Sequence, residues 1–163
     1  MRASAEAVAR LQSTEAPWIA FLESGQWREV HDLLTTEPDL RVIEVDGARC
    51  QTKSSLFEEF SIRLRFPGYF GRNWDAFDEC MRDLEWLPGR GYILVVKNAD
   101  NLLGRDRQDR DTFVGIMRAA GAEWAHPRPT SQSGVPFHVL LLVPSDQFTT
   151  ADWRLPRLVN GQA

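Results

Sequence analysis

Two nearly continuous apolar runs place the strongest limit on the fold: YILVVK at residues 92–97 and FHVLLLV at residues 137–143. Runs of this kind are typical of strands that are buried on both faces of a sheet. Stretches with the apolar spacing of helices separate them, and such crossovers join parallel strands. The pattern therefore predicts an α/β fold of three layers, in which helices flank a small, mostly parallel sheet.

Two further segments are predicted to be strands. RVIEVD at residues 41–46 alternates apolar and polar residues before an Asp-Gly turn signal. WIAFL at residues 18–22 is a short apolar run, and a helical pattern over residues 27–34 follows it. We expect three strands, or four if this N-terminal βα unit joins the sheet. Ser54 or Ser55 is expected to cap the next helix.

The length of 163 residues fits one domain with short extensions. Residues 1–16 are polar and rich in alanine, so we expect a flexible tail there, or at most a helix. Residues 17–40 would form the βα extension, and residues 41–143 the main domain. Residues 144–163 are expected to be irregular. Four residues would anchor that end: Phe148, Trp153, Leu155 and Leu158.

The whole net charge of −4 comes from one short segment. Residues 73–85 contain five acids and one base, whereas the rest of the chain has 18 of each and sums to zero. A protein without a basic surface is not expected to bind DNA or RNA nonspecifically. The segment is therefore the first place to look for a function.

The two cysteines, Cys50 and Cys80, are too few for a disulfide framework, and no Cys or His spacing indicates zinc. The N-terminus has no apolar stretch like that of a signal peptide, and no apolar run is long enough to cross a membrane. We therefore expect a cytoplasmic protein with buried thiols, no cofactor and no membrane contact.

Residues 66–85 form the densest constellation of side chains that could carry a function. Asn73 suits the N-cap of a helix with two distinct faces. The apolar face consists of Trp74, Phe77, Met81 and Leu84, and the charged face of Asp75, Asp78, Glu79 and Arg82. Two readings stay open: an ordinary solvated helix face, or a surface that docks on a basic, concave partner.

Catalysis fits these residues less well. Asp75 and Glu79 would lie on one exposed helix face, whereas the carboxylates of a glycosidase face each other across a cleft. Cys80 adjoins the apolar stripe, and as a nucleophile it would need one of the three histidines beside it. The sequence has no P-loop, GxSxG, HExxH or GxGxxG motif. We predict no catalytic residue and no metal ligand.

The segment YFGRNWDAFDEC at residues 69–80 resembles the barstar family, intracellular inhibitors of barnase-type ribonucleases. Two aromatic residues, a glycine and an Asn-x-Asp-Ala start lead into an acidic helix that contains a cysteine. The flanking strands and helices occur in the family's order, and the resemblance covers residues 41–143. It implies the family's fold, with one strand and one helix added at the N-terminus.

The resemblance implies that this loop and helix plug the active site of a ribonuclease. The acids would stand in for RNA phosphates and meet basic residues of the enzyme. By position, Tyr69, Asn73 and Asp75 match contact residues of the family. Glu79 matches the most important acid, with a side chain one methylene longer.

The sequence also departs from the family pattern. Asp78 replaces an interfacial tryptophan, and Asp83 and Leu84 replace a glycine and a second tryptophan. The acid of the third helix is missing, with Ala119 nearest to its position. The predicted partner-binding residues are Tyr69, Phe70, Gly71, Asn73, Asp75, Asp78, Glu79, Arg82 and Asp83.

The expected partner is a cognate ribonuclease or nuclease toxin with a basic active-site cleft. The protein would act as an immunity or antitoxin-type inhibitor and would not contact nucleic acid directly. The alternative is a barstar-fold module that binds another basic protein, or a toxin that is not a ribonuclease.

Overall fold

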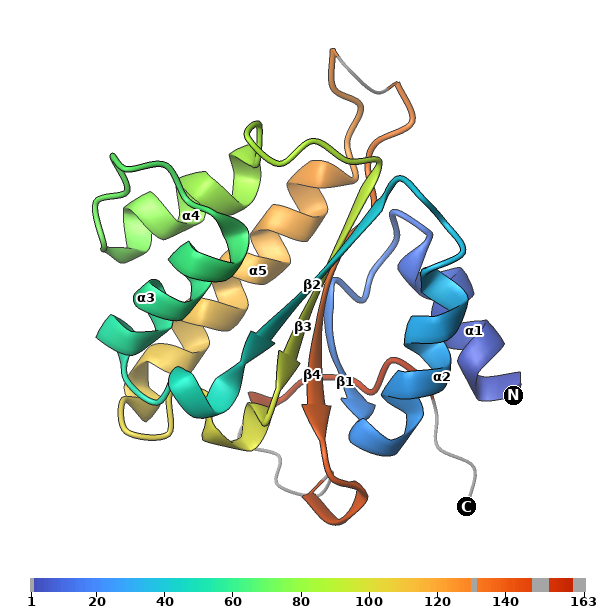
Figure 1. Ribbon diagram of the computed structural model, residues 1–163, viewed down its shortest axis with the longest axis horizontal. Coiled ribbons are helices and arrows are strands. Elements are labelled where there is room, and N and C mark those ends of the chain that lie inside the picture. Colours follow the sequence, from blue (N-terminus) through green and yellow to red (C-terminus); the bar gives the residue numbers. More distant parts are fainter. Residues whose placement is uncertain (1, 130–131, 148–152, 160–163) are drawn as a thin grey trace.

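Four parallel strands form one sheet in the computed structural model, which describes residues 2–129, 132–147 and 153–159. The order is β1-β4-β3-β2, so the N-terminal strand pairs with β4 at one edge (Figure 1). The expected fourth strand therefore joins the sheet. The strands are β1 (Ile19–Glu23), β2 (Leu40–Asp46), β3 (Gly91–Lys97) and β4 (Phe137–Val143).

Helices cover both faces of the sheet. Figure 1 shows α3, α4 and α5 on one face, and α1 and α2 on the other. This arrangement confirms the predicted three-layer α/β architecture. The α-helices of the described residues are α1 (Arg2–Leu11), α2 (Ser24–Leu34), α3 (Lys53–Leu64), α4 (Trp74–Asp83) and α5 (Arg110–Trp124).

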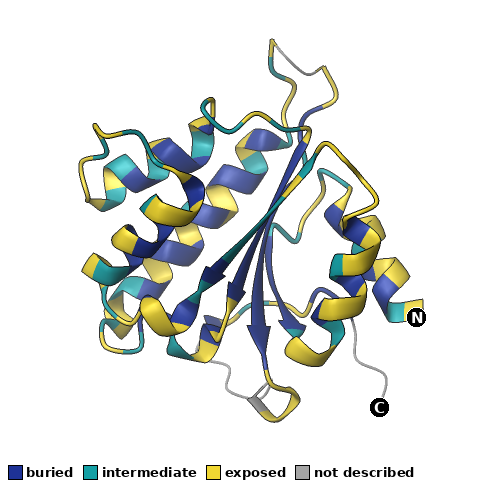
Figure 2. Cartoon of the chain, viewed as in Figure 1, coloured by how far each residue is buried: buried dark blue, intermediate teal, exposed yellow. Residues whose placement is uncertain are grey.

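The two central strands, β3 and β4, are buried over almost their whole length (Figure 2). On β3, Leu94 and Val96 belong to the core beneath α3, α4 and α5, whereas Ile93 and Val95 belong to the core beneath α1 and α2. Strand β4 alternates in the same way. Both strands are continuously apolar because each contributes to two cores.

Of the two possibilities expected for residues 1–16, a flexible tail or a helix, the helix is found, because residues 2–11 form α1. Ala7 and Leu11 are completely buried in the core that α2 also covers. Ser4 Oγ donates a hydrogen bond to Glu29 Oε2 of α2 at 2.9 Å. The helix is stabilised by this tertiary packing, which a short Ala-rich sequence does not reveal.

Thr52, rather than Ser54 or Ser55, caps helix α3. The Thr52 hydroxyl accepts from the Ser55 N–H at 3.1 Å, and the Ser55 hydroxyl accepts from the Thr52 N–H at 3.0 Å. Ser55 is thus the third helical residue of a reciprocal capping box.

The C-terminal segment runs along the outer edge of β1. The Phe21 N–H donates to the Pro156 carbonyl at 2.9 Å, and the Leu158 N–H donates to the Phe21 carbonyl at 2.7 Å. These bonds satisfy backbone groups that an edge strand otherwise leaves unpaired.

The predicted anchors of this segment fit that position. Trp153 and Leu158 are buried, and Leu155 is half-buried, whereas Phe148 lies outside the described residues. The Arg110 guanidinium lies 4.5 Å above the Trp153 ring centroid. Apart from an isolated bridge between Arg157 and Phe21, residues 154–159 form no helix or strand, whereas residues 145–147 of the expected irregular extension form a short 3₁₀ helix.

His138 of β4 links the sheet to the segment that precedes β1. Its Nδ1 lies 2.9 Å from the Pro17 carbonyl oxygen, and its Nε2 lies 2.7 Å from the Ser13 carbonyl oxygen. A neutral imidazole carries one N–H and donates to only one of them. Burial lowers the pKa of His138 below its ordinary value, and the two carbonyls offset only part of that effect.

Deleting residues 1–39 is predicted to prevent stable folding of the remaining chain. The deletion uncovers four side chains that are at most 4% exposed: Ile93, Val95, Leu140 and Leu142. Burial of one such side chain contributes about 1.5–3 kcal/mol, against a typical domain stability of about 5–15 kcal/mol. We expect the deletion variant to lose its cooperative thermal transition in circular dichroism. Deletion of residues 1–11 alone is the milder control, and a cooperative transition for residues 40–163 would contradict the prediction.

The lowered pKa of His138 predicts a stability that depends on pH. The unfolded chain takes up this proton near pH 6.5, whereas the folded protein takes it up only at lower pH. The free energy of unfolding should therefore fall as the pH drops below about 6.5. In urea titrations, we expect a smaller difference between about pH 7.5 and about pH 5.5 for His138→Gln than for wild type. Equal pH dependence in the two proteins would show that the histidine does not contribute.

Candidate partner-binding surface

Helix α4 begins at the predicted cap. Asn73 Oδ1 accepts from the Ala76 N–H at 2.8 Å, and Asn73 Nδ2 donates to the Gly71 carbonyl at 3.3 Å. The cap thus joins the helix to the loop before it, which holds Gly71. The helix ends at Asp83, and Leu84 follows with a left-handed backbone (φ 49°).

An aromatic cluster holds the buried side of α4. Phe77 is completely buried, and its ring centroid lies 5.2 Å from that of Phe60 on α3. Met81 and Leu84 are also completely buried, and Trp74 is half-buried at the start of the helix. The predicted apolar stripe is confirmed, so the opposite side of α4 faces solvent.

Two tryptophan side chains tie the ends of α4 to α5 and the turn before it. Trp74 Nε1 donates to Asp109 Oδ1 at 3.2 Å, and Trp124 Nε1 donates to the Met81 carbonyl at 2.8 Å. These partners are 35 and 43 residues apart in the sequence. The orientation of α4 is therefore set by tertiary contacts at both ends.

The loop before α4 exposes one aromatic ring and packs another inward. The Tyr69 residue is 78% exposed. Phe70 is half-buried, with ring centroids 5.8 Å from Phe57 and 4.8 Å from Phe66. Both are predicted site residues, but this geometry makes Tyr69 the ring that a partner can reach and Phe70 its support.

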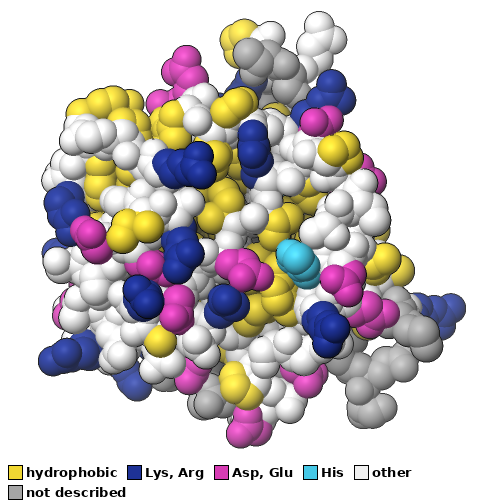
Figure 3. All heavy atoms as spheres, viewed as in Figure 1, with side chains coloured by type: hydrophobic (Ala, Val, Ile, Leu, Met, Phe, Trp, Pro, Cys, Tyr) yellow, Lys and Arg dark blue, Asp and Glu magenta, His cyan; other side chains and the backbone are white. Residues whose placement is uncertain are grey.

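The outer side of α4 carries three exposed acidic side chains. Asp75, Glu79 and Asp83 are exposed, and none forms an ion pair with any residue that the structure describes. Elsewhere, the face that carries β2 mixes acidic and basic side chains (Figure 3). Asp75 also lies in the first helical turn, where the helix dipole favours a negative charge.

Asp78 and Arg82, two further predicted site residues, are paired with each other. Arg82 Nη2 lies 2.7 Å from Asp78 Oδ2, and Arg82 Nη1 lies 3.4 Å from Glu123 Oε2 of α5. Burial opposes the charge of Arg82, but attraction to the two carboxylates outweighs it and raises the pKa of Arg82 further. Arg128 donates to the Arg82 carbonyl at 3.0 Å and stacks 3.6 Å above the Trp124 ring.

Sequence reasoning missed Glu123. It considered only Ala119 as the place of an acid on this helix, whereas Glu123 lies one turn later and reaches Arg82 on α4. The sequence could have indicated Glu123, because residues four positions apart, such as Ala119 and Glu123, lie on the same face of a helix.

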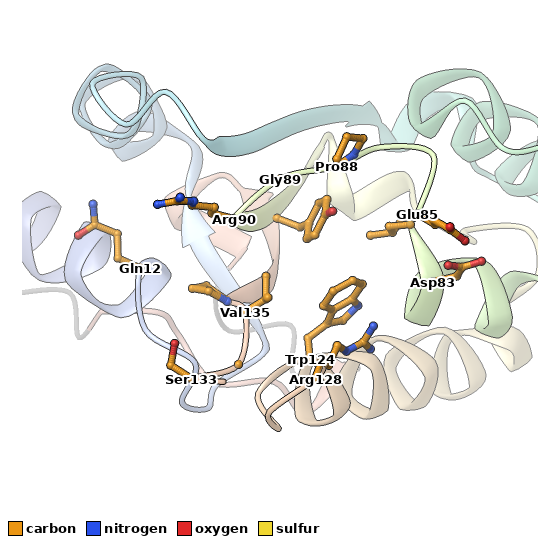
Figure 4. A pocket seen from close by; sticks show the side chains of 14 residues that line it. Gln12, Asp83, Glu85, Pro88, Gly89, Arg90, Trp124, Arg128, Ser133 and Val135 are labelled. Atoms are coloured by element: carbon orange, nitrogen blue, oxygen red, sulfur yellow. The ribbon is translucent and has the colours of Figure 1, made fainter. Parts of the chain in front are cut away.

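A groove of about 870 Å³ lies beside the C-terminal end of α4 (Figure 4). Asp83 and Glu85 line it together with Arg90 and Arg128, and the Trp124 ring faces it. Because its lining carries both signs of charge, the groove does not extend the acidic face of α4.

The thiols lack the surroundings of a nucleophile. Cys80 is 6% exposed and Cys50 is completely buried. Burial is the main cause that raises the pKa of Cys80 to about 11 and that of Cys50 to about 12. Phe137 and Val139, the neighbours of His138 on β4, belong to the same core as Cys80. Successive side chains of a strand point to opposite faces, so His138 lies on the other face of the sheet from Cys80.

Neither a metal cluster nor a membrane-spanning helix occurs among the described residues. No group of three or more His, Cys, Asp or Glu side chains in these residues has the geometry to hold a metal ion. No described helix is long and apolar enough to cross a membrane.

The sequence matches the family Barstar (barnase inhibitor) over residues 40–142. The chain belongs to the barstar family. The matched region begins at the first residue of β2 and ends one residue before the end of β4. It therefore contains the proposed barstar-type loop and α4, whereas α1, β1 and α2 lie outside it.

Individual relatives show how far the similarity extends. The chain is 36% identical over 59 residues to the putative ribonuclease inhibitor YrdF of Bacillus subtilis (strain 168), an alignment that covers 36% of this chain and 62% of that protein. Among solved structures, the Aeropyrum pernix ORC2 protein in its ADPNP–ADP complexes is similar, with a TM-score of 0.59 and 14% identity. That likeness covers 94% of this chain and 42% of the other, and it concerns the fold alone.

Both thiols are predicted to resist alkylation in the native protein. At about pH 8 they are almost entirely protonated and shielded, whereas the thiolate is the reactive form. We expect mass spectrometry to find Cys50 and Cys80 labelled by iodoacetamide only after unfolding in guanidinium chloride. Rapid labelling of native Cys80 would instead support a reactive thiol at this surface.

Proposed function

We propose that this protein inhibits a barnase-type ribonuclease by placing Tyr69 and the acidic face of α4 in the enzyme's basic active-site cleft. The family match carries this proposal, since the family is described as barnase inhibitors. The resemblance of residues 69–80 to the family's inhibitory segment supports it. In this role the chain performs no catalysis, and it protects the cytoplasm of the producing cell as an immunity or antitoxin-type protein.

The electrostatics of α4 support the same surface. Asp75 and Glu79 are exposed on successive turns, and no described base neutralises them. Unpaired carboxylates attract a basic cleft over several ångströms and steer its approach. Association rates on the order of 10⁸ M⁻¹ s⁻¹ at low salt, falling with added salt, are typical of such pairs.

The rigidity of the surface favours tight binding. The Asn73 cap, the buried Phe77 ring and the Trp124 hydrogen bond hold α4 in place before any partner arrives. A preorganised surface loses little conformational entropy on binding. An interface of ordinary size, about 1,600 Å² in total, would extend beyond α4 to the loop that carries Tyr69.

One observation favours a second candidate function. The paired Asp78 and Arg82 occupy a rim where the resemblance implies an interfacial tryptophan. A partner selected by that rim could be another basic protein, or a toxin that is not a ribonuclease. Such a partner would bind α4 without any effect on RNA cleavage.

The double variant Asp75→Asn/Glu79→Gln tests the proposed site. It removes two charges while keeping the size of both side chains, and loss of a buried interfacial charge pair typically costs 2–5 kcal/mol or more. We expect inhibition of the cognate ribonuclease to weaken by about 100-fold or more. The assay titrates RNA cleavage by a panel of barnase-type ribonucleases, including any nuclease encoded beside the gene.

A matched control removes the same charge elsewhere. Asp32 and Glu37 are exposed on and just after α2, on the opposite face of the sheet from α4. Asp32→Asn/Glu37→Gln should inhibit like wild type. Equal inhibition by wild type and the α4 variant would refute the site, and binding of a basic protein without inhibition would favour the second candidate.

A further inference from the structure

We propose that Arg82 determines the specificity of the docking face: it neutralises Asp78 and Glu123 in the unbound protein and confines the attraction for a basic partner to Asp75, Glu79 and Asp83. This inference rests on the proposed function and assigns a role to one residue of that site.

The ion pairs divide the exposed side of α4 into two strips. Arg82 spans the seam between α4 and α5, with one guanidinium nitrogen 2.7 Å from Asp78 and another 3.4 Å from Glu123. Arg128 adds a second positive charge, 4.0 Å from the other oxygen of Glu123. Two acids and two bases thus cancel along this seam.

The other strip keeps its charge. Asp75, Glu79 and Asp83 follow one another at i,i+4 spacing, so they lie in a row along the helix. None of them forms an ion pair with the part of the chain that the structure describes. The negative field of α4 is therefore strongest along this row and weak beside α5.

The seam contributes little to folding, which leaves recognition as its larger effect. The side chains of Asp78, Arg82 and Glu123 are 30–48% exposed, and ion pairs at such exposure add little stability. In the described structure, Arg82 Nε is buried and finds no hydrogen-bond acceptor. An arrangement chosen for stability alone would not leave this donor unsatisfied.

The consequence is an unfavourable strip within an acidic site. A partner with cations opposite Asp75 and Glu79 is attracted, whereas one with a cation opposite the seam loses hydration there without gaining a net attraction, because Arg82 and Arg128 already balance Asp78 and Glu123. Interfaces gain specificity from such unfavourable contacts with the wrong partner as well as from favourable ones with the right partner. We therefore expect the cognate ribonuclease to have a neutral or acidic group facing Arg82.

Arg82→Met is the direct test, because methionine keeps an apolar stem and removes the charge. Arg10→Met is the matched control: it changes net charge equally, and the Arg10 side chain is 46% exposed and lies 3.2 Å from Glu6 at the same i,i+4 spacing on α1. Binding is measured by calorimetry, and inhibition is measured across the ribonuclease panel. We expect at least one ribonuclease that binds wild type weakly to bind Arg82→Met about tenfold more tightly. Its association rate should also fall more steeply with salt than that of wild type. Arg10→Met should behave as wild type.

A second variant covers the case in which Arg82→Met does not fold. Asp78→Asn/Glu123→Gln leaves Arg82 without its carboxylate partners, and we expect about tenfold weaker binding to the cognate ribonuclease. The control is Asp32→Asn/Glu37→Gln, which changes the net charge by the same amount and should bind normally.

The outcomes separate the two proposals. If wild type binds a ribonuclease and Arg82→Met shows unchanged selectivity and salt dependence, the role of Arg82 is refuted and the proposed function stands. If neither protein binds any ribonuclease of the panel, both proposals fall. Arg82→Lys keeps the charge and should retain the selectivity of wild type, so relaxed selectivity in that variant would also refute a purely electrostatic role.

Discussion

Phe77 lies completely buried beneath α4, and the position of the acidic face depends on the packing around this ring. Aromatic neighbours contact it from α3, from α5, from the loop before α4 and from α4 itself. Their centroids lie 5.2–6.3 Å from that of Phe77 in the contacts with Phe57, Phe60, Phe66, Trp74 and Phe113. Edge-to-face and tilted rings at these distances favour one orientation over others. Because this packing fixes the rotation of α4 about its axis, it also fixes the side on which the carboxylates of α4 lie.

The elements that the sequence predicted well are those whose signals are local. The continuous apolar runs identify β3 and β4, and the spacing of Phe77, Met81 and Leu84 identifies the buried side of α4. The Asn73 cap is equally local, because its acceptor and donor lie three residues apart. Each of these patterns fits within about three helical turns or one strand.

The parts that escaped prediction depend on contacts between distant residues. Helix α1 has few large apolar side chains and is held by Ala7 and Leu11 in the core shared with α2. The pairing of Arg82 with Glu123 joins residues 41 positions apart. Phe70 lies in the same loop as the exposed Tyr69 ring, and only the packing against Phe57 and Phe66 shows that it turns inward. No periodicity within a single helix or strand carries this information.

The left-handed backbone at Leu84 limits the reach of α4 in a way that matters for a partner. With 10 residues, the helix is about 15 Å long. Asp75 and Glu79 are separated along its axis by about 6 Å, less than the Debye length of about 8 Å at physiological ionic strength. An approaching cation therefore experiences them as one compact divalent anion rather than as two independent charges. The helix thus concentrates its negative charge over a short length, and this charge is complementary to a narrow basic cleft rather than to a broad basic surface.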